Sequence, residues 1–246
     1  MPRFVASIEA RMGSSRLPGK VLEDLAGAPA LTRLVRRLRR ARRLDGIVLA
    51  TTTGAEDDAL ARWAEAEGVA CFRGSEDDVL ARVVEAQRTM TSDVVVEVCG
   101  DTPLLDPVVV DMAIDAFESQ ACDVVTTTRE QSFPDGIDAE VFRLADLEEV
   151  AATVADPAVR EHVSLHFYQQ PDRYRVFHLP APPQWRRPEI RLVLDEPADL
   201  ERIREIYARL EPDFGDAFGT GDIIDLIDRD PALAGARPAA GERAAP

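Results

Sequence analysis

Residues 10–20 concentrate groups that bind anions. The segment holds two glycines, two serines and the three cations Arg11, Arg16 and Lys20, and it follows a short apolar run. Backbone N–H groups of a glycine-containing loop and positively charged side chains are the ligands that proteins use for phosphate groups. The spacing matches neither a Walker A loop nor a Gly-x-Gly-x-x-Gly fingerprint. The segment therefore predicts a polyphosphate site of another kind.

Lys20 is the only lysine of the chain. A compact ammonium binds phosphate as a point charge, which the planar guanidinium group of arginine does not reproduce. A chain that uses arginine for every other basic residue thus keeps an ammonium where phosphate binding is predicted. The alternative is a single surface lysine without a specific function.

Two aspartates are predicted at the same edge of a sheet. Asp101 follows the apolar run at residues 94–98, and Asp195 follows the apolar run at residues 190–194. Ligands of α/β proteins bind at the carboxyl ends of the strands, so both carboxylates are expected beside the cationic loop. Two such carboxylates can hold a magnesium ion that also binds phosphate oxygens. The alternative for each aspartate alone is a helix N-cap, because a proline-containing helix start follows each one.

Short apolar runs alternate with segments of helical periodicity over the first 130 residues. Strands are predicted at residues 4–8, 47–50, 69–72, 94–98 and 123–127. Helices are predicted at residues 31–44, 56–67, 77–88 and 107–117. Runs that are apolar on both faces are typical of buried parallel strands. The pattern therefore predicts an α/β fold that begins with a βαβ unit.

The alternation becomes less regular in residues 130–190, which we interpret as a subregion added to the main sheet. The sequence predicts strands at 139–142, 173–179 and 190–194, the last returning to the sheet, and helices at 144–152, 157–167 and 197–210. One domain is expected over residues 1–232. Residues 233–246 have little apolar surface to bury and are expected to form a disordered tail.

Composition narrows the class of protein. The 246 residues fit one domain, 46% of them are hydrophobic, and the formal net charge is −16. This charge argues against nucleic-acid partners and against binding to anionic membranes. Three cysteines without Cys-x-x-Cys spacing predict neither a disulfide framework nor a zinc site. No apolar run is long enough for a signal core or a membrane span, so a reduced cytoplasmic protein without stable membrane insertion is expected.

Arginines crowd residues 33–43, where seven of them surround the apolar positions of a predicted helix. The simplest interpretation is a solvated helix face in an arginine-rich chain. A contact with anionic lipid or with an acidic subunit is the alternative.

Six segments in the same order resemble sugar-acid cytidylyltransferases, the group that contains the CMP-N-acylneuraminate and CMP-3-deoxy-manno-octulosonate synthetases. The resemblance is greatest to the spore coat polysaccharide biosynthesis branch. The segments are residues 10–20 (ARMGSSRLPGK), 72–80 (FRGSEDDVL), 100–107 (GDTPLLDP), 133–142 (FPDGIDAEVF), 160–163 (REHV) and 195–200 (DEPADL).

This resemblance implies a fold and a reaction. The fold is that of the nucleotide-diphospho-sugar transferases, a Rossmann-like, mostly parallel mixed sheet flanked by helices. The reaction is transfer of CMP from CTP to a sugar acid of the nonulosonic or octulosonic type, with release of pyrophosphate, for biosynthesis of a surface polysaccharide. The resemblance also implies a cytoplasmic, magnesium-dependent transferase that acts as a possible homodimer.

The resemblance also assigns roles to residues. Lys20, Arg11, Arg16 and Asp101 are implied as catalytic, the three cations holding the triphosphate, and Asp101 and Asp195 are implied as magnesium ligands. The full set of nucleotide-binding residues implied in this way is Ala10, Arg11, Met12, Gly13, Ser14, Ser15, Arg16, Lys20, Thr51, Thr52, Thr53, Arg73, Gly74, Ser75, Asp77, Gly100 and Asp101.

Asp138, Glu140, Glu161 and His162 are implied to bind the acceptor. His162 could accept the proton of the attacking hydroxyl, although a packed or capping histidine is the more common role on a helix. His166 follows four residues later, which would also suit a metal-binding pair, but no third ligand has a suitable spacing.

Two other functions fit the same residues. One is a nucleotidyltransferase that uses another nucleotide, or an acceptor that is not a sugar acid, such as a phosphonate. The other is a non-catalytic subunit that keeps the fold, which the joint presence of Lys20, Asp101 and Asp195 argues against.

Overall fold

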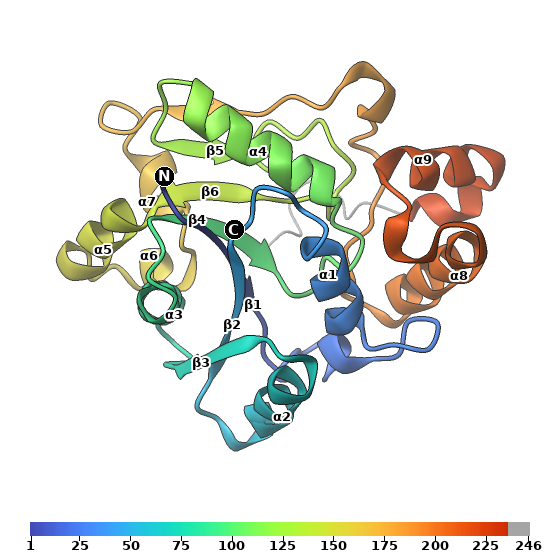
Figure 1. Ribbon diagram of the computed structural model, residues 1–246, viewed down its shortest axis with the longest axis horizontal. Helices are drawn as coiled ribbons and strands as arrows, with labels where there is room; N and C mark the ends of the chain where they lie inside the picture. Colours follow the sequence, from blue (N-terminus) through green and yellow to red (C-terminus); the bar gives the residue numbers. More distant parts are fainter. Residues whose placement is uncertain (236–246) are drawn as a thin grey trace.

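In the part of the chain that the computed structural model describes, residues 1–235, seven strands form one sheet (Figure 1). The order across the sheet is β3-β2-β1-β4-β6-β5-β7. The strands are β1 (Phe4–Glu9), β2 (Gly46–Thr52), β3 (Ala70–Gly74), β4 (Val94–Cys99), β5 (Val124–Thr126), β6 (Glu140–Arg143) and β7 (Val176–His178).

The sheet is mixed and mostly parallel. Strand β1 pairs in parallel with both β2 and β4, β2 pairs in parallel with β3, and β5 with β7. Strand β6 runs antiparallel to both of its neighbours, β4 and β5. The predicted fold class, a Rossmann-like mostly parallel mixed sheet, is confirmed.

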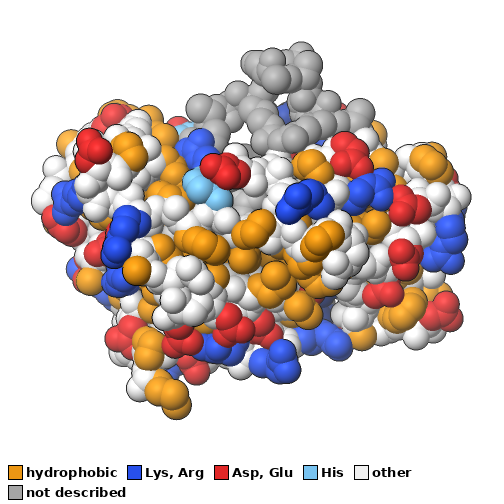
Figure 2. All heavy atoms as spheres, turned by 90° about the horizontal axis from the view of Figure 1, so that it is seen from above, with side chains coloured by type: hydrophobic (Ala, Val, Ile, Leu, Met, Phe, Trp, Pro, Cys, Tyr) orange, Lys and Arg blue, Asp and Glu red, His pale blue; other side chains and the backbone are white. Residues whose placement is uncertain are grey.

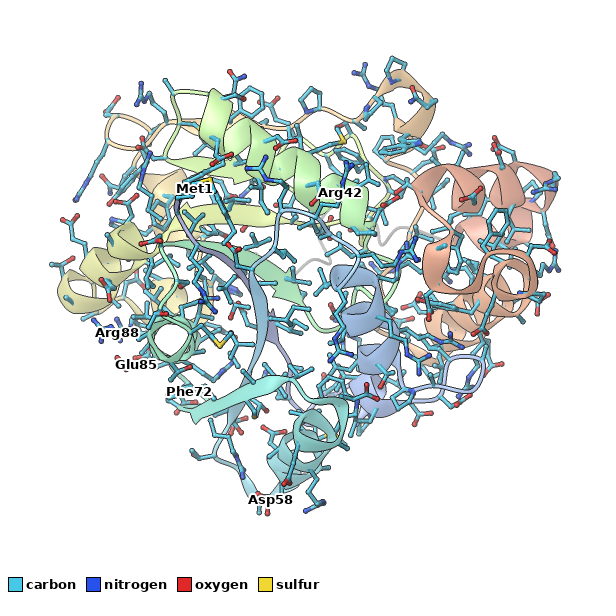
Figure 3. All side chains as sticks on the ribbon, in the orientation of Figure 1. Met1, Arg42, Asp58, Phe72, Glu85 and Arg88 are labelled. Atoms are coloured by element: carbon cyan, nitrogen blue, oxygen red, sulfur yellow. The ribbon has the colours of Figure 1, made fainter. Side chains whose placement is uncertain are left out.

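Helices cover both faces of the sheet (Figure 1). One apolar core joins the sheet to α1 (Ala30–Leu38), α2 (Asp58–Glu67), α4 (Pro107–Ser119), α8 (Pro197–Phe214) and α9 (Thr220–Arg229). On the other face, α3 (Val79–Thr89), α5 (Leu144–Thr153), α6 (Pro157–Glu161) and α7 (Leu165–Gln169) pack on Val95, Val124 and Phe142. On the outward side of α3 (Figure 3), Arg88 Nε donates to Glu148 Oε1 of α5 at 2.7 Å.

Two arginines of α1 are buried, so the predicted solvated face is wrong at these positions. Arg33 and Arg37 are 1% and 0% exposed. Arg37 donates to the carbonyl oxygens of Leu104, Leu105 and Phe218 at 2.9–3.2 Å. Burial is possible because these carbonyls and aromatic rings replace the water that a guanidinium normally binds.

Arg33 is held by acidic partners from the C-terminal helices. Its guanidinium donates to Glu211 at 2.6 and 2.9 Å and to Asp216 at 3.0 Å, and it stacks over the ring of Tyr207. The arginine-rich segment therefore joins α1 to α8 inside the protein, which the sequence pattern could not distinguish from a solvated face.

Three predicted elements differ from the structure, and one helix was not predicted. The predicted helix at 31–44 ends at Leu38. The predicted helix at 157–167 is interrupted at residues 162–164, which separate α6 from α7. Residues 190–194 were predicted as a strand but form only one isolated parallel β-bridge, between Arg191 and Asp135. The helix α9 was not predicted.

The predicted tail begins too early. Leu233 is 6% exposed within the short helix Pro231–Ala234, and the carbonyl of Ala234 accepts a hydrogen bond from the backbone of Arg191 at 2.8 Å. The rest of the predicted tail, residues 236–246, lies outside the described residues.

The face seen in Figure 2 carries acidic and basic side chains interspersed around an apolar area, and shows no continuous basic surface. Among the described residues, no helix is both long and apolar enough to span a membrane.

We predict that Arg37→Met destabilises the protein by at least about 3 kcal/mol. The substitution keeps most of the side-chain volume but leaves three buried carbonyl oxygens without donors, and each unsatisfied group costs about 1–3 kcal/mol. Urea unfolding followed by circular dichroism measures the change. Arg36→Met is the matched control, because Arg36 lies on the exposed side of the same helix and should change stability by less than about 0.5 kcal/mol. Equal effects of the two substitutions would contradict the structural role of Arg37.

Candidate active site

Two adjoining cavities lie at the carboxyl ends of β1 and β4. The first has a volume of about 710 Å³ and is lined by the loop that follows β1 and by Cys99, Gly100 and Asp101 after β4. The second, of about 650 Å³, extends toward β6 and α7. The two cavities share Arg16, Asp101 and Asp195 among other lining residues. We call them the loop cavity and the β6 cavity.

Lys20 lies between the two predicted metal ligands. Its Nζ donates to Asp101 Oδ2 at 2.7 Å and to Asp195 Oδ1 at 3.0 Å. Arg16 Nη2 lies 2.5 Å from the other oxygen of Asp195. Burial by itself lowers the pKa of Lys20, but the two carboxylates outweigh this effect and raise the pKa above its ordinary value. Lys20 is thus a cation throughout the physiological pH range.

Asp57 anchors residues 10–20, which we call the cationic loop. The sequence did not predict this role of Asp57. This buried carboxylate accepts the backbone N–H of Met12 at 2.7 Å and also the hydroxyl of Thr52. The loop therefore takes its conformation from the end of β2, two strands away from β4. The sequence placed Asp57 only inside the predicted helix at 56–67 and gave no sign of this role.

Most of the residues predicted to bind nucleotide line the loop cavity. They are Ala10, Arg11, Gly13, Ser14, Ser15, Arg16, Lys20, Asp77, Gly100 and Asp101. Among them, Arg11 has its guanidinium 3.3 Å from the carboxylate of Glu76, which also lines this cavity.

The remaining predicted residues do not line the cavity: Met12, Thr51, Thr52, Thr53, Arg73, Gly74 and Ser75. Arg73 is engaged structurally, because it donates to the carbonyls of Thr52 and Gly54 at 2.8 Å and to Asp58 at 2.6 Å. Thr51 is fully buried. Thr52 reaches the loop of residues 10–20 only through Asp57, which binds both Thr52 and Met12.

Arg82 lines the loop cavity, although the sequence marked it only as one helical residue among others. It is 4% exposed, and its Nε has no hydrogen-bond partner among the described residues. Burial lowers the pKa of Arg82, and the nearby carboxylate of Glu9 opposes this effect. A buried guanidinium with an unused donor is suited to an anionic ligand.

All four residues predicted for the acceptor, Asp138, Glu140, Glu161 and His162, line the β6 cavity. Glu140 is tightly held, because it accepts the Thr126 hydroxyl at 2.7 Å and the Tyr168 hydroxyl. Its position is therefore determined by neighbouring strands and by α7.

Carboxylates of adjacent strands face the same cavity. Glu97 of β4 is registered opposite Glu140 of β6, and Glu9 of β1 lies on the same side of the sheet. Burial raises the pKa of Glu9 to about 7 and the pKa of Glu97 well above its ordinary value. Burial likewise raises the pKa of Asp138 to about 7. A larger fraction of these three carboxyl groups therefore carries a proton at neutral pH than is usual for aspartate and glutamate.

The two histidines of the interrupted helix lie in different surroundings. His162 ends α6 and lines both cavities, whereas His166 packs against the rings of Phe167 and Tyr174. Within residues 1–235, no group of three histidine, cysteine or acidic side chains is placed to hold a metal ion. The structure therefore gives no support to a histidine metal pair.

Comparison with known proteins agrees with this geometry. A model of the cytidylyltransferase family matches residues 5–214. The spore coat polysaccharide biosynthesis protein SpsF of Bacillus subtilis is 35% identical over 241 residues, 94% of this chain and 97% of that protein. A 3-deoxy-manno-octulosonate cytidylyltransferase of Anaeromyxobacter sp. is 40% identical over 121 residues, 48% of each chain.

Among solved structures, a cytidylyltransferase from Leptospira borgpetersenii serovar Hardjo-bovis has the same fold. Its TM-score is 0.88 at 28% identity, over 95% of this chain and 97% of that chain. The match of the family model includes the loop after β1, the end of β4 and the start of α8, which together build both cavities. The chain therefore belongs to the cytidylyltransferase family of nucleotidyltransferases.

Proposed function

We propose that the protein transfers CMP from CTP to a sugar acid of the nonulosonic or octulosonic type, releasing pyrophosphate, in the biosynthesis of a surface glycoconjugate. The observation that carries the proposal is the position of Lys20 and its two aspartates where the loop cavity meets the β6 cavity. A relative active on 3-deoxy-manno-octulosonate and the similarity to SpsF support the acceptor class and the pathway.

The loop cavity receives the nucleotide in this proposal. Arg11, Arg16 and Lys20 neutralise the triphosphate, and the backbone of residues 13–15 contributes N–H donors. Arg82 adds a buried cation to the same wall. Because Asp57 restrains the loop before any ligand binds, less conformational entropy is lost when the triphosphate is ordered.

Asp101 and Asp195 suit a magnesium ion by their chemistry. Their carboxylates converge on one cation, the Lys20 ammonium, and magnesium in nucleotide sites is commonly held by one or two carboxylates together with substrate phosphates. When bound, magnesium would neutralise charge on phosphate oxygens. Lys20 would then exchange at least one aspartate for a phosphate oxygen.

Transfer of CMP needs an acceptor hydroxyl in line with the bond to the departing pyrophosphate. The β6 cavity opens toward that bond, because Asp101 and Asp195 line both cavities. His162 also lines both, so it can accept the proton of the hydroxyl as phosphorus is attacked. Lys20 and Arg16 stabilise the charge that develops on the phosphate oxygens.

We also propose a cytoplasmic enzyme, which the three free cysteines support. The homodimer implied by the family resemblance stays a prediction that size-exclusion chromatography with light scattering can test.

We predict that Lys20→Ala lowers the rate of pyrophosphate release from CTP at least ~100-fold, since removal of one preorganised charge that stabilises a transition state has an effect of this order. Lys20→Arg should recover only a small part of the rate, because the guanidinium does not fit as a point charge between two carboxylates. Arg62→Ala, which removes an exposed cation on α2, is the control and should keep the wild-type rate. A Lys20→Ala protein that is folded by circular dichroism and fully active would refute the assignment.

We predict that CTP with magnesium stabilises the protein more than UTP, GTP or ATP. At ~100 times its dissociation constant a ligand adds about 2.7 kcal/mol to the free energy of unfolding, which is visible as a thermal shift. The shift should disappear in Lys20→Ala. A larger shift with another nucleotide would identify that nucleotide, rather than CTP, as the donor. No shift with any nucleotide would contradict the proposed reaction.

A further inference from the structure

Helix α6 is short, and the residues at its C-terminal end line both cavities. It contains the five residues Pro157–Glu161. Glu161 and His162 line the loop cavity as well as the β6 cavity. A helix of this length is not stable by itself, because the cost of helix nucleation exceeds what so few backbone hydrogen bonds return. The positions of Glu161 and His162 therefore depend on the contacts that α6 makes with its neighbours.

Two side chains of α6 make these contacts where the helix lies against α3 (Figure 1). Val159 is buried in the apolar cluster that also contains Leu80 of α3. Arg160 donates from Nη1 to the carbonyl oxygen of Ala151 in α5 at 2.6 Å and from Nη2 to the carboxylate of Asp78. The apolar contact has no preferred direction, whereas a planar guanidinium with acceptors on two sides fixes one orientation. Arg160 therefore determines how α6 is turned.

Asp78 connects Arg160 to a wall of the loop cavity. It is the N-cap of α3, where one carboxylate oxygen accepts the backbone N–H of Ala81 at 3.0 Å and the other accepts the hydrogen bond from Arg160. Glu76 and Asp77, directly before it in the chain, line the loop cavity. One carboxylate thus joins the segment beside the nucleotide site to the helix that ends at His162.

The Asp78–Arg160 ion pair is largely shielded from solvent. The side chain of Asp78 is 28% exposed and that of Arg160 is 20% exposed. Hydrogen bonds between two charged groups are short and directional, and partial burial protects them from screening by salt. The pair is therefore suited to holding two segments in a fixed relative position, which an exposed pair of long side chains does poorly.

We propose that Arg160 and Asp78 are positioning residues, whose ion pair fixes Glu161 and His162 relative to a nucleotide in the loop cavity. This inference rests on the proposed function and deepens it, because it links binding of the donor to the acceptor side of the site. A nucleotide that contacts residues 76–77 orders the wall that ends at Asp78, and the ion pair extends this order to α6. The acceptor then loses less conformational entropy when it binds.

The first test is hydrogen–deuterium exchange of the full chain with and without CTP and magnesium. In the wild type we expect the nucleotide to slow exchange at least about threefold in residues 10–20, 75–78 and 158–163, since ligand binding suppresses local opening. In Asp78→Asn the first two segments should stay protected, while residues 158–163 lose more than half of their protection. Asparagine keeps the N-cap of α3 but removes the charge that pairs with Arg160.

The second test is the steady-state rate of pyrophosphate release with 3-deoxy-manno-octulosonate as the acceptor. Asp78→Asn and Arg160→Met should each lower kcat/KM for the acceptor at least about tenfold, since a small misplacement of reacting groups has effects of this order or larger. Neither should change KM for CTP more than about twofold, because neither residue lines the loop cavity. The double variant should be no more than about twofold worse than Arg160→Met, because both substitutions remove the same ion pair.

Asp156→Asn is the matched control. It makes the same exchange at an exposed N-cap, that of α6 itself, where the side chain accepts the backbone N–H of Ala158 at 2.9 Å. Because asparagine also caps a helix, this variant should keep both the kinetics of the wild type and the protection of residues 158–163.

Protection of residues 158–163 that survives in both Asp78→Asn and Arg160→Met would overturn the inference, as would its absence in a wild type whose residues 10–20 are protected. Loss of protection in all three segments alike would assign the pair a purely structural role and would overturn it as well. If CTP protects no segment of the wild type, the proposed function itself fails. If CTP protects residues 10–20 but 3-deoxy-manno-octulosonate does not react, only the acceptor class is wrong, and the exchange measurement decides the inference.

Discussion

The ammonium of Lys20 joins three segments that are distant in the chain: the loop after β1, the end of β4 and the start of α8. Without it, the like charges of Asp101 and Asp195 would repel each other. Asp101 and Asp195 line both cavities, so the geometry of the loop cavity and of the β6 cavity depends on one charge.

The change of strand direction within the sheet separates the surroundings of the loop cavity from those of the β6 cavity. Where β1, β2 and β4 run parallel, their carboxyl ends place the cationic loop beside Asp101. The antiparallel strand β6 then brings Glu140 opposite Glu97 in the neighbouring register. Glu97 lies within a strand, and Glu9 and Glu140 lie at strand ends, whereas most of the other residues that line the β6 cavity come from loops.

Arginine and lysine have different uses in this protein. Arg33 and Arg37 are buried and join α1 to the C-terminal helices, and Arg73 joins the end of β2 to the start of α2. In each case the planar guanidinium reaches several acceptors at once, which an ammonium on a single atom cannot do as well. The position between two carboxylates favours the compact ammonium, and it is the position that has the only lysine.

The sequence by itself determined the α/β class, most strands of the parallel part, the cationic loop and the two aspartates, because these depend on local periodicity and on residues that end strands. It also gathered Asp138, Glu140, Glu161 and His162 into one group through their resemblance to a family, and the structure places all four on one cavity. The roles of these residues stay predictions.

Only the tertiary structure decided the burial of Arg33 and Arg37, the anchoring of the loop by Asp57, and the placement of Glu9 and Glu97 on the same side of neighbouring strands. These features join residues that are 45 to 183 positions apart, as between Met12 and Asp57 or between Arg33 and Asp216. An arginine on a helix or a glutamate in a strand has the same local pattern whether it meets water or a buried partner. The difference lies in which distant backbone and side-chain groups arrive beside it, and that is a property of the packed chain.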